Sequence, residues 1–284
     1  MKRILNCCAS DFGQEGTPLE LKGSIRSAQG RTLLSELDGC FSTLFDGVTN
    51  AEIASAFGAD LLMLKRLNWK THEFCGMAYD NPVAELRRLS GVGVGVNMNM
   101  SPEYGDFCVC EDAAIDEYVS MRPDFLSITG YRFPSVTTES VLERIEATRN
   151  RWDGFLNVHF VLSEYADLDL DRYLAFVDAG ADMITMPVPG TVQGITEERL
   201  LPVVDAIRER GALVSLTTFT SQEGSDTDTV RELALSARRC GSDVFAFGDA
   251  NICGTPEPED IMAASLAMRG KRHTYVRMAR SAAR

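Results

Sequence analysis

The stretch Gly58-Ala59-Asp60-Leu61-Leu62-Met63-Leu64 decides the fold. A glycine suits the left-handed position that follows a helix, and a short apolar run is typical of a parallel strand buried on both faces. The same order of glycine, aspartate and apolar run recurs at 180–184 and 241–247, and a looser copy lies at 122–128. The four aspartates lie about 60 residues apart, which is the spacing of an internal repeat. The pattern predicts four buried strands separated by long crossovers.

Four further strand candidates alternate with these, at 32–38, 92–99, 154–161 and 212–218. Helical patterns fill the gaps, for example at 138–150, 196–209 and 228–239, and the residues Thr49, Thr196 and Asp226 are good helix N-caps. Eight strands alternating with helices over about 250 residues predict an α/β fold, a single (β/α)8 TIM barrel. A doubly wound open sheet is the alternative. We expect one barrel domain over 1–284, in which 1–30 form a cap with a helix around 18–28, and 269–284 form a basic C-terminal tail.

Composition narrows the class of protein. The chain has 284 residues, 45% of them hydrophobic, which is enough for the core of a barrel. It contains neither a signal-peptide pattern nor an apolar run of about 18 residues, so we expect a cytoplasmic protein. None of the eight cysteines forms a C-x-x-C pair, which favours free thiols over a zinc ribbon.

The formal net charge of −13 disfavours nucleic acid as a partner, because binding to phosphates needs a basic face. We expect a small-molecule substrate, no membrane contact and a homo-oligomer. Residues 269–284 carry six arginines and lysines and no acid, so this stretch is expected to contact another subunit or the rest of the chain.

Side chains of a barrel strand alternate between the interior and the helix layer. In the third strand the alternation sends Val92, Val94 and Val96 outward, so that Gly93 and Gly95 face inward, where they make room for neighbours or ligand. The same rule places polar side chains inside, toward the carboxyl ends of the strands: Glu36, Asp38, Lys65, Asn97, Asn99, Ser127, Thr129, Asn157, His159, Ser215, Thr217 and, at the end of the eighth strand, Asp249. Because a barrel without function is filled mainly by branched apolar side chains, this set predicts a site at the carboxyl-terminal face.

Each candidate also has a purely structural interpretation. Glu36 and Asp38 are acid–base candidates, or they pair with Lys65. Lys65 is an imine-forming nucleophile or a plain cation. His159 is a general acid or base within reach of a carboxylate that favours its charged form, or it is a hydrogen-bonded core histidine. We expect Asn97, Asn99, Thr129, Asn157 and Thr217 to orient substrate.

The loops after the seventh and eighth strands lead into helices and contain glycines, an arrangement with which barrels often bind phosphate. The candidate ligands there are Ser221, Gln222, Gly224 and Gly248, with Arg66 and Arg132 of other loops as a source of positive charge.

Several stretches resemble an uncharacterised bacterial TIM-barrel family that often occurs with sugar phosphotransferase genes. They are Gly30-Arg31-Thr32, Asn50-Ala51-Glu52-Ile53-Ala54 with Phe57-Gly58-Ala59-Asp60, Thr220-Ser221-Gln222-Glu223-Gly224, Gly248-Asp249-Ala250 and residues 269–275. Some members are labelled haloacid-dehalogenase-like, but this chain lacks the opening D-x-D-x-T/V motif of that class. The resemblance implies the barrel fold and sugar metabolism.

The segment Val96-Asn97-Met98-Asn99-Met100 is similar, more weakly, to the third strand of the phosphoenolpyruvate mutase and isocitrate lyase superfamily, where D-x-D carboxylates hold magnesium. Asparagine keeps an oxygen ligand but removes the charge, so a divalent metal such as magnesium would depend on Glu36, Asp38 or Asp249.

We therefore expect an enzyme, a lyase or isomerase, that acts on a small, phosphorylated sugar-derived or keto-acid metabolite. The alternative is a metabolite-binding regulator of a sugar-uptake system. A metal-dependent hydrolase is disfavoured, because the inward set holds a single histidine.

Overall fold

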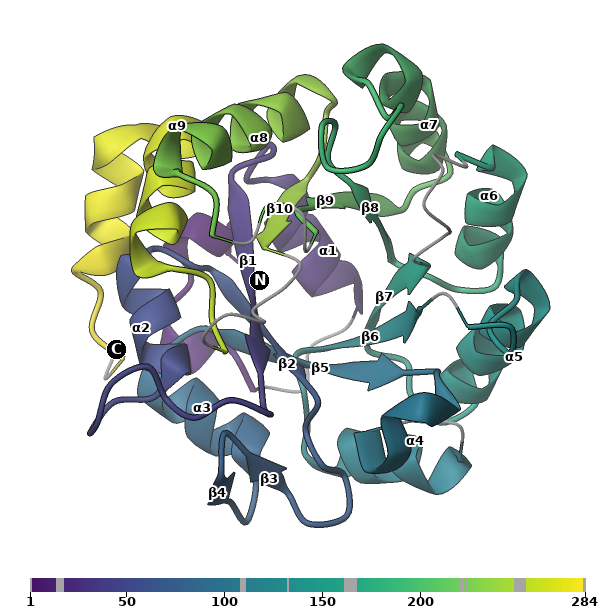
Figure 1. The fold of residues 1–284 in the computed structure, drawn as a ribbon, viewed down its shortest axis with the longest axis horizontal. Coiled ribbons are helices and arrows are strands. Elements are labelled where there is room, and N and C mark those ends of the chain that lie inside the picture. The colour runs from purple at the N-terminus through teal and green to yellow at the C-terminus, as the bar shows by residue number, and fades with distance from the viewer. Residues whose placement is uncertain are drawn as a thin grey trace.

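The computed structural model describes residues 2–13, 18–107, 111–131, 133–160, 168–219, 222, 224–247 and 254–282. Eight parallel strands close into a barrel in the order β1-β10-β9-β8-β7-β6-β5-β2 (Figure 1). They are β1 (Thr32–Asp38), β2 (Leu61–Lys65), β5 (Gly93–Asn99), β6 (Phe125–Gly130), β7 (Phe155–Phe160), β8 (Met183–Pro187), β9 (Leu213–Thr217) and β10 (Val244–Phe247). The predicted (β/α)8 barrel and all eight of its strands are confirmed, and the open sheet is excluded.

The helices form an outer ring around the strands (Figure 1). They are α2 (Asn50–Phe57), α3 (Pro82–Ser90), α4 (Asp112–Ser120), α5 (Thr138–Arg149), α6 (Leu170–Asp178), α7 (Glu197–Glu209), α8 (Thr227–Arg239) and α9 (Pro258–Met278). The predicted N-caps are confirmed: the side chains of Thr49, Thr196 and Asp226 each accept a backbone N–H of the first helical turn.

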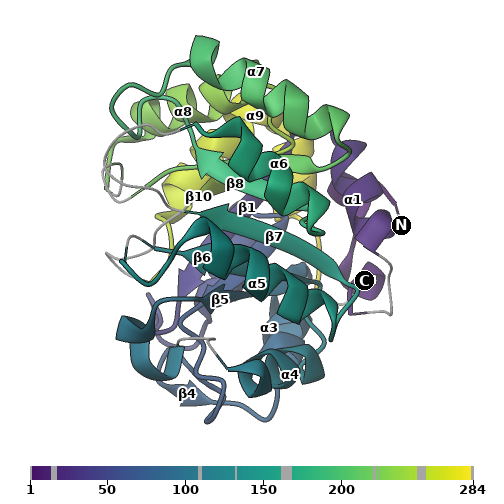
Figure 2. The same cartoon turned by 90° about the vertical axis from the view of Figure 1, so that its right-hand side faces the viewer.

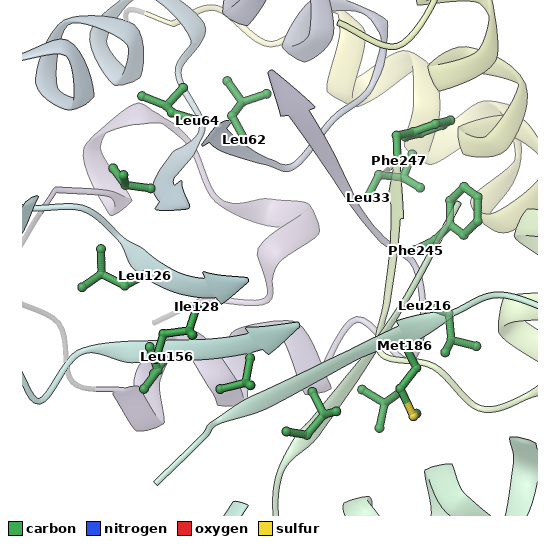
Figure 3. Packing of buried hydrophobic residues seen from close by; sticks show 14 of the residues in the cluster. Leu33, Leu62, Leu64, Leu126, Ile128, Leu156, Met186, Leu216, Phe245 and Phe247 are labelled. Atoms are coloured by element: carbon green, nitrogen blue, oxygen red, sulfur yellow. The ribbon is translucent and has the colours of Figure 1, made fainter. Parts of the chain in front are cut away.

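Successive side chains of each strand point alternately outward and inward, so the buried apolar residues form two separate clusters. The larger lies between strands and helices and includes Val94, Val96 and Leu126; Figure 3 shows members of this cluster. The smaller contains the inward residues at the amino-terminal ends of the strands, among them Leu61 and Phe155. The predicted inward and outward faces agree with these clusters.

The amino-terminal segment closes one end of the barrel. It contains η1 (Ile4–Asn6), η2 (Ala9–Asp11) and α1 (Pro18–Arg26). Its buried side chains Ile4, Phe12 and Ile25 belong to the same cluster as Leu61 and Phe155. Figure 2 shows α1 and both labelled termini together at one side of the barrel. The polar interior residues therefore lie at the opposite end.

The repeated aspartates have a shared structural role at the amino-terminal ends of the strands. Each carboxylate accepts the backbone N–H of a residue on the preceding strand, in the pairs Asp60–Leu33, Asp124–Val94, Asp182–Leu156 and Asp243–Val214. Each also pairs with an arginine from the outer helices, respectively Arg269, Arg87, Arg149 and Arg208. The repeat seen in the sequence is therefore a fourfold strand-joining device, not a ligand site.

Three features were not predicted. A two-stranded hairpin, β3 (Glu73–Phe74) and β4 (Met77–Ala78), follows β2, and η3 (Pro102–Phe107) follows β5. The basic stretch expected as a tail is largely the second half of α9, which breaks its helical geometry at Gly270 (φ 68°). Arg269 and Arg277 of this half are buried against Asp60, so the stretch makes contacts within the molecule.

Across the part of the chain that the structure describes, every helix is too short or too polar to span a lipid bilayer.

Candidate functional site

Polar side chains fill the carboxyl-terminal half of the barrel interior. Glu36, Lys65 and His159 are 2%, 6% and 4% exposed. The other buried members are Asp38, Asn97, Asn99, Ser127, Thr129, Asn157, Thr185, Ser215 and Thr217. Burial of so many polar groups is costly unless they pair with one another or serve a ligand. Their contacts decide between these two roles.

Both carboxylates of β1 are paired with cations from the end of β2. Lys65 Nζ lies 3.1 Å from Glu36 Oε2, with both side chains buried. Asp38 pairs instead with Arg66, whose Nε lies 2.8 Å from Oδ1 and whose Nη2 contacts Oδ2. Asp38 Oδ1 also accepts the Cys40 N–H at 3.0 Å. Of the two interpretations, pairing with Lys65 is thus confirmed for Glu36 and wrong for Asp38, which pairs with Arg66, a residue in a left-handed conformation (φ 52°).

His159 is held as a neutral ring inside the barrel. Its imidazole stacks on Phe219 at a centroid distance of 5.6 Å and an interplanar angle of 4°. Burial, and secondly the positive charge of Lys65, lower the pKa of His159 to about 3. We expected a carboxylate to favour the charged ring, but burial and the charge of Lys65 both favour the neutral ring. Among the described residues, His159 Nε2 is buried and has no hydrogen-bond partner.

Three of the five residues expected to orient substrate, Asn97, Thr129 and Asn157, are occupied by internal hydrogen bonds. Thr129 Oγ1 donates to Asn97 Oδ1 at 2.5 Å. Asn157 is engaged through both ends of its amide: Nδ2 donates to Ser127 Oγ at 2.8 Å, and Oδ1 accepts from Thr185 Oγ1 at 2.9 Å. These contacts brace neighbouring strands, so they account for the burial of Asn97, Thr129 and Asn157 without a ligand.

Two other candidates are engaged only in part. Asn99 Oδ1 accepts the Ser101 N–H at 3.0 Å, which leaves the donors of its amide for another role. Thr217 Oγ1 donates to the Thr218 carbonyl at 3.1 Å, which leaves the oxygen of this hydroxyl as an acceptor.

The loop between β9 and α8 carries part of the expected phosphate site. Gln222 Nε2 donates to the Gly190 carbonyl at 3.4 Å, and Gly224 has φ of +68°. Asp226 caps α8 by accepting the Thr229 N–H at 2.8 Å, and this bond lowers the pKa of Asp226. A carboxylate therefore already lies at the helix end that was expected to attract an anion. Arg132, Ser221, Gly248 and Asp249 lie outside the described residues.

Two aromatic neighbours of the site were not predicted from the sequence. Phe219 stacks on His159, and the Tyr131 ring centroid lies 6.0 Å from Lys65 Nζ. Both residues come shortly after the end of a strand, but no sequence pattern distinguishes them from other aromatic residues in loops. Arg66 was expected to supply positive charge for a phosphate, and it pairs with Asp38 instead.

The oxygens that magnesium would need are already engaged. Magnesium binds oxygen ligands. Asn97 Oδ1 and Asn99 Oδ1 both accept hydrogen bonds from the protein. Glu36 and Asp38 each face a cation. No group of three His, Cys, Asp or Glu side chains that could hold a metal is found among the described residues. Among the described residues, a magnesium ion would therefore have to compete with Lys65 and Arg66 for the two carboxylates.

Solved structures with the same topology include several enzymes. An archaeal fructose 1,6-bisphosphate aldolase matches with a TM-score of 0.56 at 13% identity, covering 85% of this chain and 94% of that one. A 2,3-dimethylmalate lyase of the PEP mutase/isocitrate lyase superfamily matches with a TM-score of 0.51 at 16% identity, covering 82% and 81%. A phosphonopyruvate hydrolase in complex with oxalate and Mg²⁺ matches with a TM-score of 0.49 at 14% identity, covering 82% and 80%. At these identities the first two similarities show the fold alone.

No curated protein sequence matches the chain. A family model described as "Domain of unknown function (DUF7916)" matches residues 5–284. The match spans the capped barrel from η1 to the end of α9, and the chain therefore belongs to the DUF7916 family.

Proposed function

We propose that the chain is an enzyme that acts on a small metabolite with a carbonyl group, a keto acid or a phosphorylated sugar derivative, by lyase or isomerase chemistry. The proposal rests on the buried Lys65–Glu36 pair and on a neutral His159, whose pKa the charge of Lys65 helps to lower and whose Nε2 has no hydrogen-bond partner among the described residues. A buried polar atom without a partner costs stability, and such costs are commonly kept where a ligand will supply the bond.

The three groups have complementary roles. Lyase and isomerase reactions next to a carbonyl share one difficulty, the negative charge that develops on the carbonyl oxygen. The Lys65 ammonium, held by Glu36, stabilises that charge in surroundings of low dielectric. Glu36 accepts the proton from the substrate carbon, and Nε2 of His159 exchanges a proton with the substrate oxygen. A ring with a pKa near 3 is neutral at pH 7, so it remains available for hydrogen bonding rather than repelling Lys65.

The remaining candidate residues have either a structural role or a role in contacting substrate. Asp38 positions Arg66, and Asn97, Thr129 and Asn157 brace the strands. We assign substrate contact to Asn99 and Thr217, which keep hydrogen-bonding capacity. The assignment of Asp249, Arg132, Ser221, Gln222, Gly224 and Gly248 stays a prediction, as do a homo-oligomer and the absence of nucleic-acid partners. A sugar-derived substrate rests on the sequence resemblance alone.

A thermal-shift screen tests the proposal. Pyruvate, oxaloacetate, oxalate and a set of sugar phosphates are added to the protein at pH 7.5, each with magnesium chloride and each with a chelator. We expect a keto acid or its analogue to raise Tm equally in both conditions, because the carboxylates of the site already have cationic partners. A shift that appears only with magnesium would contradict the assignment of charge to Lys65.

Compounds that bind are then tested for turnover with Glu36→Gln, Lys65→Met and His159→Gln. The matched control is Glu85→Gln, which alters an exposed ion pair with Arg88. Turnover that falls at least a hundredfold in the three site variants, and not in the control, supports an enzyme. A compound that binds at this end of the barrel without any turnover supports the metabolite-binding regulator instead.

A further inference from the structure

The helix α8 and the first half of α9 lie side by side in the outer ring and form one wall of the barrel (Figure 1). Both helices follow a strand, so both begin at the end of the barrel that holds the proposed active site and run toward the amino-terminal segment. The two ends of this wall carry opposite charges. Neither set of charges has a role in the proposed reaction.

The acidic end of the wall lies where the two helices begin, and we define it as Asp226, Glu257 and Glu259. All three side chains are exposed. Burial, and then the negative charges of these three residues, raise the pKa of the buried Asp260 to about 6. The charges that influence Asp260 are therefore all acidic, which shows that this end concentrates negative charge.

The basic end lies where α8 ends, beside the break in α9. Arg238 of α8 contacts the Met268 carbonyl, and Arg269 donates to the Arg31 carbonyl at 3.4 Å, so α8, α9 and the start of β1 meet here. Burial, and then the positive charges of Arg3 and Arg238, lower the pKa of Arg31. Cations from separate parts of the chain thus gather at this end.

The second half of α9 adds to this positive charge. Lys271 and Arg272 follow the break at Gly270 and are exposed. The pKa of His273 is lowered by burial and then by four cations, which are Arg3, Arg31, Arg272 and Arg269. We define the basic end as Arg3, Arg31, Arg238, Lys271 and Arg272. It stands out on a chain whose formal net charge is −13.

A neighbouring charge of the same wall is neutralised within the molecule. Arg239, the residue after Arg238, lies 2.8 Å from Glu197 of α7. Helix dipoles account for acids at helix starts and bases at helix ends, but Arg3 and Arg31 lie outside the α-helices. Within the described part of the chain, the exposed charges without such an ion pair include Glu257, Glu259, Lys271 and Arg272.

Apolar side chains lie between the two charged ends. Glu259, Met262 and Leu266 are spaced by three and four residues, so they share one face of α9. Met262 and Leu266 are partly exposed, as is Leu235 of α8. This face therefore runs from an acid, through two apolar side chains, to the basic end.

We propose that this wall is the interface of a dimer, in which a second copy of the chain binds with its α8 and α9 running in the opposite direction. A two-fold axis through the middle of the wall brings the acidic end of each copy onto the basic end of the other, and the apolar side chains onto their counterparts. A copy bound in the same direction would place like charges together. Charge complementarity therefore selects both the partner and its orientation.

The size of the wall predicts a weak dimer. The 13 residues of α8 make a helix about 20 Å long, and two helices side by side are about 20 Å wide. Each copy thus covers roughly 400 Å², about half of the area that each partner buries in a stable interface. Opposite charges must contribute much of the binding, so the dimer should dissociate as salt screens them.

The test measures the mass of the whole chain in solution by sedimentation equilibrium, over a range of protein concentrations at low and at high sodium chloride. We expect a monomer–dimer equilibrium that shifts to monomer at high salt. Lys271→Glu with Arg272→Glu, and separately Glu257→Lys with Glu259→Lys, should each raise the dissociation constant at least about tenfold, because both contacts then join like charges. All four side chains are exposed, so both variants should fold, which circular dichroism checks.

Mixing the two variants tests the orientation of the copies. In a mixed dimer the two reversed ends meet each other and the two unaltered ends meet each other, so the dissociation constant should return close to that of the original chain. The matched control, Glu143→Lys with Glu146→Lys, changes two exposed acids on α5, at the opposite side of the barrel (Figure 1). It should leave the dissociation constant unchanged. Lys65→Met should do the same, which separates this interface from the proposed active site.

Three outcomes would overturn the proposal. One is a chain that stays monomeric at low salt; its retention on heparin through Lys271 and Arg272 would assign the basic end to a polyanion. Another is a mixture of the two variants that fails to associate. The third is a series of species larger than a dimer, which would mean that the ends stack head to tail without a two-fold axis.

Discussion

Arg269 and Asp60 form an ion pair between two fully buried side chains that lie 209 residues apart in the chain. The arginine also donates to the Gly58 carbonyl, two residues before the aspartate. Arg87, Arg149 and Arg208 make the same double contact with the other three repeats, to the carbonyls of Arg122, Gly180 and Gly241. The barrel thus consists of four similar quarters, each a pair of neighbouring strands joined by one aspartate that binds an arginine of an outer helix. The copy at Asp60 joins the last helix to the first quarter.

The four aspartate–arginine pairs differ in burial, so we expect the loss of each pair to reduce the stability of the protein by a different amount. Asp60→Asn keeps an oxygen that can accept the Leu33 N–H but leaves Arg269 and Arg277 without their carboxylate. We expect it to lower the free energy of unfolding by about 3–5 kcal/mol. The matched variant Asp124→Asn should cost less, because the side chains of Asp124 and Arg87 are about 10% exposed and water can solvate the remaining charge. Urea denaturation checks both; equal losses would show that charge burial is not the cause.

The Glu36–Lys65 pair predicts a coupling in stability as well as in activity. Each single variant, Glu36→Gln or Lys65→Met, leaves one buried charge that has lost its partner. The double variant leaves neither. We expect the double variant to be less destabilised than the sum of the singles by about 2 kcal/mol or more. Additive losses in a double-mutant cycle would mean that the two side chains do not act as a pair.

His159 predicts a specific dependence of stability on pH. Its pKa is about 3 in the folded chain and about 6.5 in the unfolded chain. Between these values the unfolded chain binds a proton that the folded chain does not, so stability falls as pH falls from 6.5 toward 3, by up to about 1.4 kcal/mol per pH unit. In His159→Gln, the dependence of the unfolding free energy on pH should be smaller by the contribution of one bound proton, as measured by denaturation at pH 4 to 7. His72→Gln is the control, and an unchanged slope in His159→Gln would place the ring in water.

Lys65 is expected to act as a cation and not as an imine-forming amine. Its ammonium lies 3.1 Å from a carboxylate and 6.0 Å from the Tyr131 ring centroid, and both favour the charged form. Treatment with pyruvate or oxaloacetate and borohydride should therefore leave Lys65 without a reduced adduct by mass spectrometry. An adduct at Lys65 that depends on the keto acid would establish covalent catalysis in its place.

Gly95 makes room for a neighbour and not for a ligand. A Cβ at this position would lie 2.4 Å from the ring of Phe125, whereas the helical Gly23 has nothing within 4 Å. Gly95→Ala should destabilise the barrel by about 1–3 kcal/mol through overpacking. Gly23→Ala should be neutral or stabilise by up to about 1 kcal/mol. Thermal unfolding of the two variants compares them directly, and a harmless Gly95→Ala would mean that the Phe125 ring can move.

Local patterns in the sequence were sufficient to predict the strands, their inward faces and three helix caps. The apolar runs, the alternation in β5 and β7 and the residues Thr49, Thr196 and Asp226 act over a few neighbouring residues, where backbone geometry alone relates position to direction. For that reason the polar set around Glu36, Lys65 and His159 was also predictable.

Only the tertiary structure decided which of these groups meet. Asp38 pairs with Arg66 because a left-handed turn after β2 points the arginine back, and no pattern in the sequence marks that turn. His159 is neutral because the closed barrel and the side chain of Phe219 shield its imidazole from water, and because the barrel brings the charge of Lys65 close enough to influence it. Arg269 and Arg277 reach Asp60 because the closed barrel places the end of the chain beside its first two strands. The sequence by itself determined which side chains face inward, since that depends on the backbone period. The partners and charge states of these side chains were decided by contacts across the barrel, because burial and electrostatic interaction depend on distances that only the closed barrel creates.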